Sequence, residues 1–227
     1  MNIADRILYE DNHLMIVNKL AGEIVQGDKT QDIPLIDLIK KYIKERDQKP
    51  GNVFCGLVHR IDRPVSGCVI FAKTSKALSR MCEIVKNRQI SKNYIALVEN
   101  PPLIPQQTLV HYLYRNEKQN KTYVSLYEKK GFLRSELSYE IVKQFDHYTL
   151  LKIMLHTGRH HQIRAQLSAI GCCIKGDLKY GAKRSNKDGS ISLHAYQVAF
   201  EHPISHLYID VKAPLSGELA KIINGYF

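Results

Sequence analysis

Strand-like apolar runs follow one another directly along much of this chain, and this succession constrains the fold more than any other feature. Consecutive strands with no helix between them can pair antiparallel, whereas parallel pairing needs a long crossover connection. The sequence therefore predicts an α+β fold with a large, mostly antiparallel sheet. The strand-like runs are Tyr94–Val98, Leu137–Val142, Tyr148–Leu155, Leu193–Phe200 and Leu207–Val211.

Two segments of the first half have apolar residues at helical spacing. The first covers Leu35–Arg46, and the second follows Thr74-Ser75 with Leu78 and Met81 on one stripe. Ahead of both, Ile7–Lys19 is predicted to form two short strands around an Asp-Asn turn. Strands thus outnumber helices, which are expected to flank the sheet.

Composition is that of an ordinary globular protein. Of the 227 residues, 44% are hydrophobic and 24% charged, which excludes disorder. No stretch reaches the roughly 18 apolar residues that span a bilayer, and acidic residues near the amino terminus exclude a signal peptide. Five cysteines without a CxxC pair fit reduced thiols, so we predict a cytoplasmic protein. We expect one domain over residues 1–227, with room for two lobes that share one sheet and divide near residues 100–106.

A formal net charge of +11 and a sequence pI near 9.4 favour a polyanionic partner. Three basic clusters are candidate phosphate contacts, with solubilising surface charge as the alternative for each. They are Lys40-Lys41 with Lys44, Lys129-Lys130 with Arg134, and Lys183-Arg184 with Lys187.

One aspartate lies in a loop that leads into a buried strand. The segment His59–Gly67 contains Pro64 and Gly67, which prevent a continuous strand, and the apolar run Cys68–Ala72 follows it. Functional groups are often held on a loop that a rigid element fixes. Taken alone, Asp62 also fits a turn aspartate that caps its own backbone.

A second polar cluster lies where a strand gives way to a helix. Gly158 permits a sharp turn, and the helix that follows brings Arg164 beside His160 and His161. Such a cluster can bind phosphate or hold a carboxylate. The adjacent histidines point in different directions and have no partner at ligand spacing, so no metal site is predicted.

Two further residues allow two interpretations each. Tyr94 lies near the start of an alternating strand, where a tyrosine is usually a core residue with a bonded hydroxyl. Asp177 lies in the glycine-bounded segment Gly176–Gly181 and fits either a turn residue or the second carboxylate of a glycosidase.

Together and in this order, these segments resemble the RluA-type pseudouridine synthases from Ile7 to about Val211. The resemblance implies the pseudouridine synthase catalytic fold, in which the active-site cleft crosses a large mixed sheet flanked by helices. It also implies an isomerase that converts uridine in structured RNA to its C-glycoside without metal or cofactor. The matching pieces are Ile7–Gly22, Arg60–Asp62, Lys92–Val98, Thr157–Arg164 and Gly176–Gly181.

The resemblance assigns roles to individual residues. Asp62 falls on the catalytic aspartate, Tyr94 on the tyrosine that packs on the uracil ring, and Arg164 on the arginine that pairs with the catalytic carboxylate. Arg60 falls on the arginine associated with the space of the flipped base. Whether Asp62 attacks C1′ of the ribose or removes a proton at C2′ stays open. The residues expected to bind RNA or substrate are His59, Arg60, Arg159, His161, Gln162 and Leu167.

Departures from the family pattern lie beside these positions and bear on target recognition. Ile61 stands for a leucine and Pro64-Val65 for a polar residue and threonine, while His160 replaces a threonine and Gln166 a histidine. The amino-terminal S4-type RNA-binding module of many relatives is expected to be absent, so this domain must bind RNA itself.

The expected substrate is ribosomal RNA, by analogy, or transfer RNA, and the chain is expected to act as a monomer without a protein partner. Two other functions stay open. One is an RNA-binding module without catalysis, and the other is a base-releasing glycosidase that pairs Asp62 with Asp177.

Overall fold

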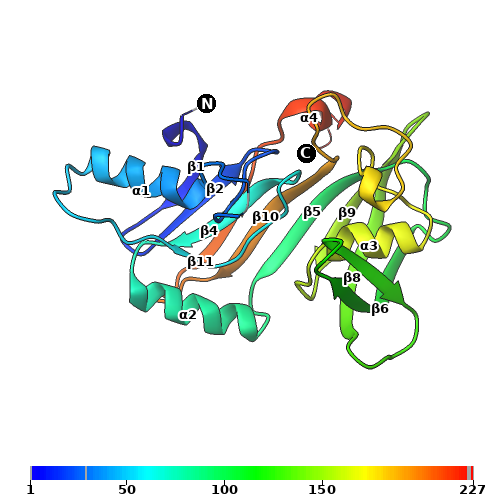
Figure 1. Cartoon of the computed structure of the whole chain (residues 1–227), viewed down its shortest axis with the longest axis horizontal. Helices are drawn as coiled ribbons and strands as arrows, with labels where there is room; N and C mark the ends of the chain where they lie inside the picture. The colour runs from blue at the N-terminus through cyan, green and yellow to red at the C-terminus, as the bar shows by residue number, and fades with distance from the viewer. Residues whose placement is uncertain (1, 29, 224–225, 227) are drawn as a thin grey trace. The chain divides into compact units, whose positions relative to one another are not determined.

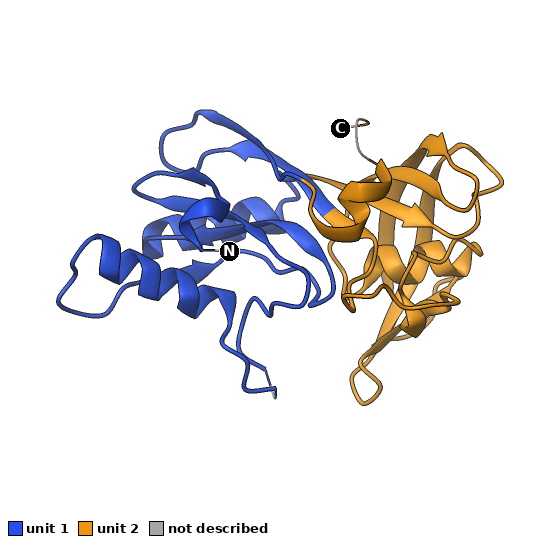
Figure 2. Ribbon diagram, turned by 90° about the horizontal axis from the view of Figure 1, so that it is seen from above, with its two compact units in different colours: residues 1–91, 195–214 blue, residues 92–194, 215–227 orange. Residues whose placement is uncertain are grey.

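The structure is a computed structural model that describes residues 2–28, 30–223 and 226. It divides into two compact units, coloured separately in Figure 2. Unit 1 comprises Met1–Ser91 and Ala195–Pro214, and unit 2 comprises Lys92–His194 and Leu215–Phe227. The chain enters unit 2 within strand β5 (Ser91–Val98) and returns to unit 1 within strand β10 (Leu193–Glu201).

Unit 1 holds strands in the order β1-β2-β4-β10, with β3 paired to β4 and β11 paired to β10. The pairs β1–β2, β2–β4, β3–β4 and β10–β11 are all antiparallel. Besides most of β10, its elements are η1 (Ala4–Arg6), β1 (Ile7–Glu10), β2 (Leu14–Lys19), α1 (Leu35–Arg46), β3 (Gly56–Leu57), β4 (Ser66–Ala72), α2 (Ser75–Lys86) and β11 (Tyr208–Lys212).

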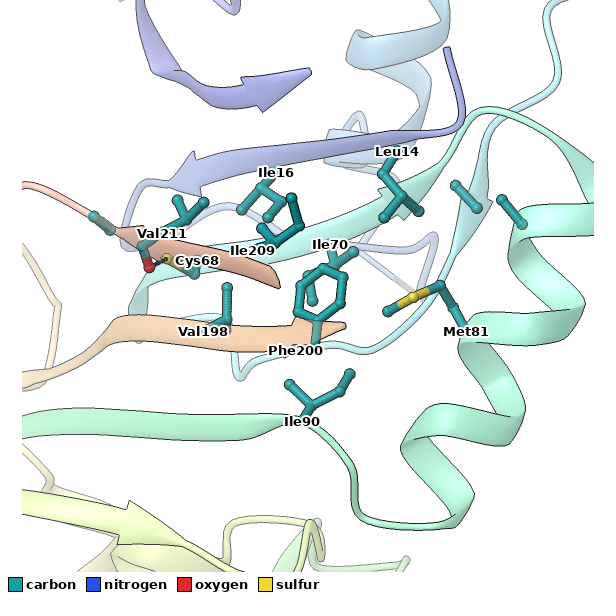
Figure 3. Close-up of a cluster of buried hydrophobic side chains, with 13 residues drawn as sticks. Leu14, Ile16, Cys68, Ile70, Met81, Ile90, Val198, Phe200, Ile209 and Val211 are labelled. Atoms are coloured by element: carbon teal, nitrogen blue, oxygen red, sulfur yellow. Dashed lines mark hydrogen bonds between the residues drawn. The ribbon is translucent and has the colours of Figure 1, made fainter. Parts of the chain in front are cut away.

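Helices α1 and α2 cover opposite faces of β2 and β4, as the alternation of side chains along a strand requires (Figure 1). Ile16 points to one face and packs in a cluster that includes Met81 of α2 and Phe200 of β10 (Figure 3). Its neighbour Val17 points to the other face and packs in a cluster that includes Ile39 of α1. All six residues of β2 are buried, because the strand is covered on both faces.

Both helices predicted in this unit are confirmed. The first has the expected bounds, Leu35–Arg46. The second begins at Ser75 because the side chain of Thr74 accepts a hydrogen bond from the amide of Ala77 at 3.2 Å, which satisfies a donor of the first turn.

Unit 2 holds strands in the order β5-β9-β8-β6-β7, all paired antiparallel. Helix α3 lies against β6 and β7. The strands β6 and β7 were not among the runs that the sequence predicted. Besides most of β5, the elements are β6 (Gln106–Asn116), β7 (Lys121–Ser125), β8 (Leu133–Gln144), β9 (Thr149–Leu155), α3 (Gln162–Ala169), η2 (Leu178–Tyr180) and α4 (Gly217–Ile223).

Antiparallel strands flanked by helices confirm the predicted α+β fold class. The longest helices have 12 residues. Across residues 2–28, 30–223 and 226, the structure contains no helix with the length and apolar character needed to cross a membrane.

Candidate active site

The loop that carries Asp62 joins β3 to β4 in unit 1. The amide of Val65 donates to the carbonyl oxygen of Asp62 at 3.0 Å and closes a turn. The next carbonyl oxygen, that of Arg63, accepts from the amide of Gly22 at 2.8 Å and from Nζ of Lys19 at 3.0 Å. The side chain of Asp62 is partly exposed. The main chain that follows this partly exposed aspartate is therefore fixed.

Two more contacts fix the ends of this loop. Nε2 of His59 accepts a hydrogen bond from the amide of Ile70 in β4 at 3.3 Å. Gly67 has a φ of 115°, and a Cβ there would lie 2.6 Å from the amide nitrogen of Ala195. Because neither the conformation nor the space admits a side chain, glycine is required where the loop enters β4.

Lys19, at the end of β2, holds the Asp62 loop from inside the protein. Its side chain is fully buried, and Nζ donates to the carbonyl oxygens of Leu20 at 2.8 Å and Arg63 at 3.0 Å. Burial, partly offset by the carboxylates of Glu23 and Asp62, lowers the pKa of Lys19 to about 7. Sequence reasoning missed this residue, although a single lysine ending an apolar strand was a visible signal.

The arginines on either side of Asp62 differ in their surroundings. Arg60, expected to act in the space of the flipped base, is exposed. Arg63 donates through Nη2 to Asp32 at 2.7 Å in an exposed ion pair. The role expected for Arg60 stays a prediction.

Tyr94 lies on β5 in unit 2, opposite Ile153 of β9, and is 8% exposed. Lys92, two residues earlier, points to the same face of the strand. Burial lowers the pKa of Lys92. A Cβ added at Gly158 would lie 3.4 Å from Nζ of Lys92, so this amine lies against the turn that precedes α3.

Arg164 and Asp177 form a buried, bidentate ion pair in unit 2. Nε of Arg164 donates to Oδ2 of Asp177 at 2.6 Å and Nη2 donates to Oδ1 at 2.8 Å. The guanidinium carbon lies 5.0 Å from the ring centre of Tyr180. The carbonyl oxygen of Asp177 accepts from the amides of Tyr180 and Ala182, both at 3.0 Å. Asp177 is thus a turn residue and also the anion that orients Arg164.

Gln162 ties together the turn before α3. Its Oε1 accepts from Oγ1 of Thr157 at 2.8 Å and from the amide of Arg159 at 3.0 Å. Its Nε2 donates to the carbonyl oxygen of Glu136 at 3.0 Å. The amide group of Gln162 is therefore engaged in holding the turn, while Arg159 is exposed and Leu167 is fully buried.

His161 ends the same turn in a left-handed conformation, with a φ of 50°. The hydroxyl of Tyr180 accepts from the amide of Thr122 at 2.8 Å and lies 2.9 Å from Nδ1 of His161. Burial, followed by the nearby cation of Arg164, lowers the pKa of His161 to about 2. His161 is therefore neutral, and its Nδ1 shares a hydrogen bond with the Tyr180 hydroxyl. The ring of His160 stacks on His161 with centres 3.7 Å apart. The expectation that the two histidines point in different directions was wrong, because both precede the helix.

The sequence profile of the family described as RNA pseudouridylate synthase matches residues 13–169, more than half of the chain. The chain belongs to this family. The predicted resemblance is thereby confirmed, and the chain is an RNA pseudouridine synthase, which is an isomerase.

Relatives of this pseudouridine synthase cover nearly its whole length. Ribosomal large subunit pseudouridine synthase C of Buchnera aphidicola subsp. Acyrthosiphon pisum (strain APS) is 37% identical, over 98% of this chain and 71% of its own. Uncharacterized RNA pseudouridine synthase YlyB of Bacillus subtilis (strain 168) is 28% identical, over 96% and 71%. The solved structure of human RNA Pseudouridylate Synthase Domain Containing 4 has a TM-score of 0.80 at 19% identity, over 96% of this chain and 91% of that one. That likeness shows the shared fold.

Two departures of this synthase from the family pattern contact the β6–β7 hairpin. His160 Nδ1 lies 2.9 Å from Oγ1 of Thr122, which in turn donates to the His160 carbonyl oxygen at 2.8 Å. Nε2 of Gln166, which replaces a histidine, lies 3.2 Å from Nδ1 of His111. His160 therefore connects the turn before α3 to the hairpin, and Gln166 connects α3 itself to it.

Proposed function

We propose that this synthase isomerises uridines in large-subunit ribosomal RNA, with Asp62 as the catalytic group and without metal or cofactor. Relatives in Buchnera, Pasteurella multocida and Vibrio parahaemolyticus are named ribosomal large subunit pseudouridine synthase C and are 31–37% identical. We further propose that it acts in the cytoplasm as a monomer. The observation that carries the assignment of Asp62 is its loop, whose main chain is held by Lys19, Gly22 and Val65.

The reaction breaks the N1–C1′ bond of uridine and forms a C5–C1′ bond. In the proposed route Asp62 acts on the ribose, either as nucleophile at C1′ or as base at C2′. The uracil then detaches, rotates and rejoins through C5. The C5 proton leaves with the help of Tyr94, N1 ends protonated, and no atom is gained or lost.

Arginines supply the other proposed functions. Extruding a uridine from folded RNA costs a few kcal/mol, and the exposed Arg60 is suited to occupy the vacated space. Arg164 is proposed to pair with the catalytic carboxylate. Its Nε and Nη2 are already bound to Asp177, so the orientation of its guanidinium is set before RNA binds.

A glycosidase that uses Asp177 as its second carboxylate is disfavoured by the same pair. A general acid must donate a proton, yet both carboxylate oxygens of Asp177 accept hydrogen bonds from Arg164. An enzyme that isomerises leaves the mass of the RNA unchanged, whereas a glycosidase releases uracil and leaves an abasic site.

The test compares wild type, Asp62→Asn and the control Asp37→Asn, which changes an exposed carboxylate on α1 in the same unit. Large-subunit ribosomal RNA and transfer RNA, both lacking the modification, serve as substrates. Pseudouridine is mapped in each RNA, free uracil is measured, and RNA affinity is determined separately. We expect Asp62→Asn to lose more than about 1000-fold in kcat while retaining affinity within about threefold, and Asp37→Asn to behave as wild type.

Three results would contradict the proposal. Activity of Asp62→Asn close to wild type would remove the catalytic role from Asp62. Modification of transfer RNA alone would overturn the ribosomal target. Release of free uracil by the wild type would replace isomerisation by hydrolysis.

A further inference from the structure

The sheet of unit 2 has a face on which aromatic side chains are exposed. Tyr114 of β6 lies directly opposite Tyr123 of β7, so both side chains point to the same face. They are 44% and 42% exposed. Leu113 and Thr122, their neighbours in sequence, point to the opposite face and are each 3% exposed. The tyrosines are therefore directed to solvent by the register of the hairpin.

Phe132, just before β8, continues this surface. Its ring stacks on that of Tyr114, with ring centres 5.4 Å apart and planes inclined by 30°. The hydroxyl of Tyr123 donates to Oε1 of Gln119, which fixes the orientation of its ring. We call Tyr114, Tyr123 and Phe132 the aromatic strip.

Positive charge surrounds the aromatic strip. Nζ of Lys121 lies 6.0 Å from the ring centre of Tyr123, and Nζ of Lys129 lies 5.9 Å from that of Phe132. From residue 114 to residue 134 the sequence has six basic and two acidic residues. One of the six, Arg134, pairs with Glu136 at 2.7 Å. The strip thus combines aromatic faces with lysine amines that lie about 6 Å from the ring centres.

We propose that the aromatic strip binds an unpaired segment of the substrate RNA, with bases stacked on its rings and phosphates contacted by Lys121 and Lys129. This inference rests on the proposed function, because it takes RNA as the substrate. Proteins that bind single-stranded nucleic acid combine a positive surface with aromatic platforms, and every base offers a face for stacking. Lys129 also lies in a basic cluster that the sequence suggested for phosphate contacts.

A protein partner fits the same surface less well. Protein interfaces are depleted of charge at their centre, and lysine is among the residues they avoid. Here Lys121 and Lys129 lie over the rings themselves. RNA offers the negative charge that this arrangement lacks, and a chain with a net charge of +11 attracts it from a distance.

The test begins with a double variant, Tyr114→Ala with Tyr123→Ala, and a conservative one, Tyr114→Phe with Tyr123→Phe. Tyr208→Ala, which removes a 71% exposed tyrosine of β11, is the matched control. Affinity is measured for an unpaired oligouridine and for a blunt RNA hairpin with a short loop. We expect the alanine pair to weaken oligouridine binding at least about tenfold, with hairpin binding unchanged within about threefold. The phenylalanine pair and Tyr208→Ala should resemble wild type, because stacking needs the ring and not the hydroxyl.

A fluorescent variant tests the strip without any need for catalysis. The natural chain has no tryptophan, so Tyr123→Trp introduces a single indole into the strip. Stacking of a base on that indole should quench its emission when oligouridine is added. If the wild type makes no pseudouridine and the emission is still quenched, the proposed function fails and the strip stands.

Two results would overturn the strip. In the first, the wild type makes pseudouridine, the alanine pair binds oligouridine with unchanged affinity, and the emission of Tyr123→Trp is not quenched. In the second, light scattering shows that the wild type is a dimer and the alanine pair a monomer, while the RNA affinity of the alanine pair is unchanged. The strip would then be an interface between copies of the chain.

Discussion

Replacing Lys19 by methionine removes the buried amine that holds the Asp62 loop and keeps a side chain of similar length. Two effects on stability oppose each other. The carbonyl oxygens of Leu20 and Arg63 lose a donor, which costs about 1–3 kcal/mol for each. Burial of the amine lowers the pKa of Lys19 from 10.5 to about 7. The methionine variant does not bury an amine, and this stabilises it by about 5 kcal/mol at neutral pH. The free energies of unfolding at pH 7 should therefore differ by less than about 3 kcal/mol.

The pH dependence separates these two effects. Between pH 7 and pH 10.5 the unfolded chain keeps its proton on Lys19 while the folded chain has lost it. Because the unfolded state binds more protons in this window, the stability of the wild type rises with pH. Integrated from pH 7 to pH 9, the gain is about 2 kcal/mol. Lys19→Met lacks this contribution, so its stability relative to wild type should fall by that amount between pH 7 and pH 9.

Urea unfolding of both proteins at pH 7 and pH 9 measures the change, and other titrating groups cancel in the difference. Lys40→Met, which removes a partly exposed lysine of α1, is the control and should stay within about 0.5 kcal/mol of wild type at both pH values. A stability difference between Lys19→Met and wild type that is the same at both pH values would refute the reasoning. A looser Asp62 loop should also lower kcat by about 10- to 100-fold.

Four other outcomes are expected. Gly67→Ala should lower the free energy of unfolding by at least about 3 kcal/mol. The new Cβ would overlap the main chain of Ala195, and the positive φ of residue 67 is strained for alanine. Gly22→Ala, with a φ of 91° and open space around it, should cost only about 1 kcal/mol in the same urea titration. Asp177→Asn should cost about 3–5 kcal/mol by calorimetry or urea unfolding, since it removes the buried charge that both Nε and Nη2 of Arg164 contact. RNA affinity should fall with a log–log salt slope near −4, as expected for about 6 phosphate contacts to single strands, and a flat salt response would contradict the electrostatic argument.

Strands with regular apolar patterns could be predicted from the sequence, and β6 shows where that approach failed. Its inward positions are Leu109, His111 and Leu113, all buried. A histidine lies in the middle of the inward row, and the outward row holds Tyr112, which is partly exposed, and Tyr114, which is exposed. The alternation of apolar and polar residues on which strand prediction relies is therefore lost. His111 is tolerated there because Nε2 of Gln166 lies 3.2 Å from its Nδ1, a partner that no local pattern reveals.

The sequence pointed to individual residues of the candidate site, but it could not show which side chains contact one another. The order of motifs led to Asp62, Tyr94 and Arg164, and their catalytic roles stay predictions. The bidentate contact between Arg164 and Asp177 depends on a turn closed 13 residues later, so sequence spacing could not reveal it. The buried state of Lys19 likewise depends on the carbonyl oxygen of Arg63, 44 residues away.

The segment before α3 contains a histidine that is not suited to proton transfer near neutral pH. A histidine in a catalytic segment is normally the first candidate for proton transfer near neutral pH. His161 cannot serve, because its pKa lies near 2 and the Tyr180 hydroxyl occupies its Nδ1. It acts as a neutral support that connects η2 to the start of α3. Lys19, whose pKa is about 7, titrates in that range and lies beside the loop of the proposed catalytic carboxylate. An inflection of kcat near pH 7 in the wild type should therefore disappear in Lys19→Met.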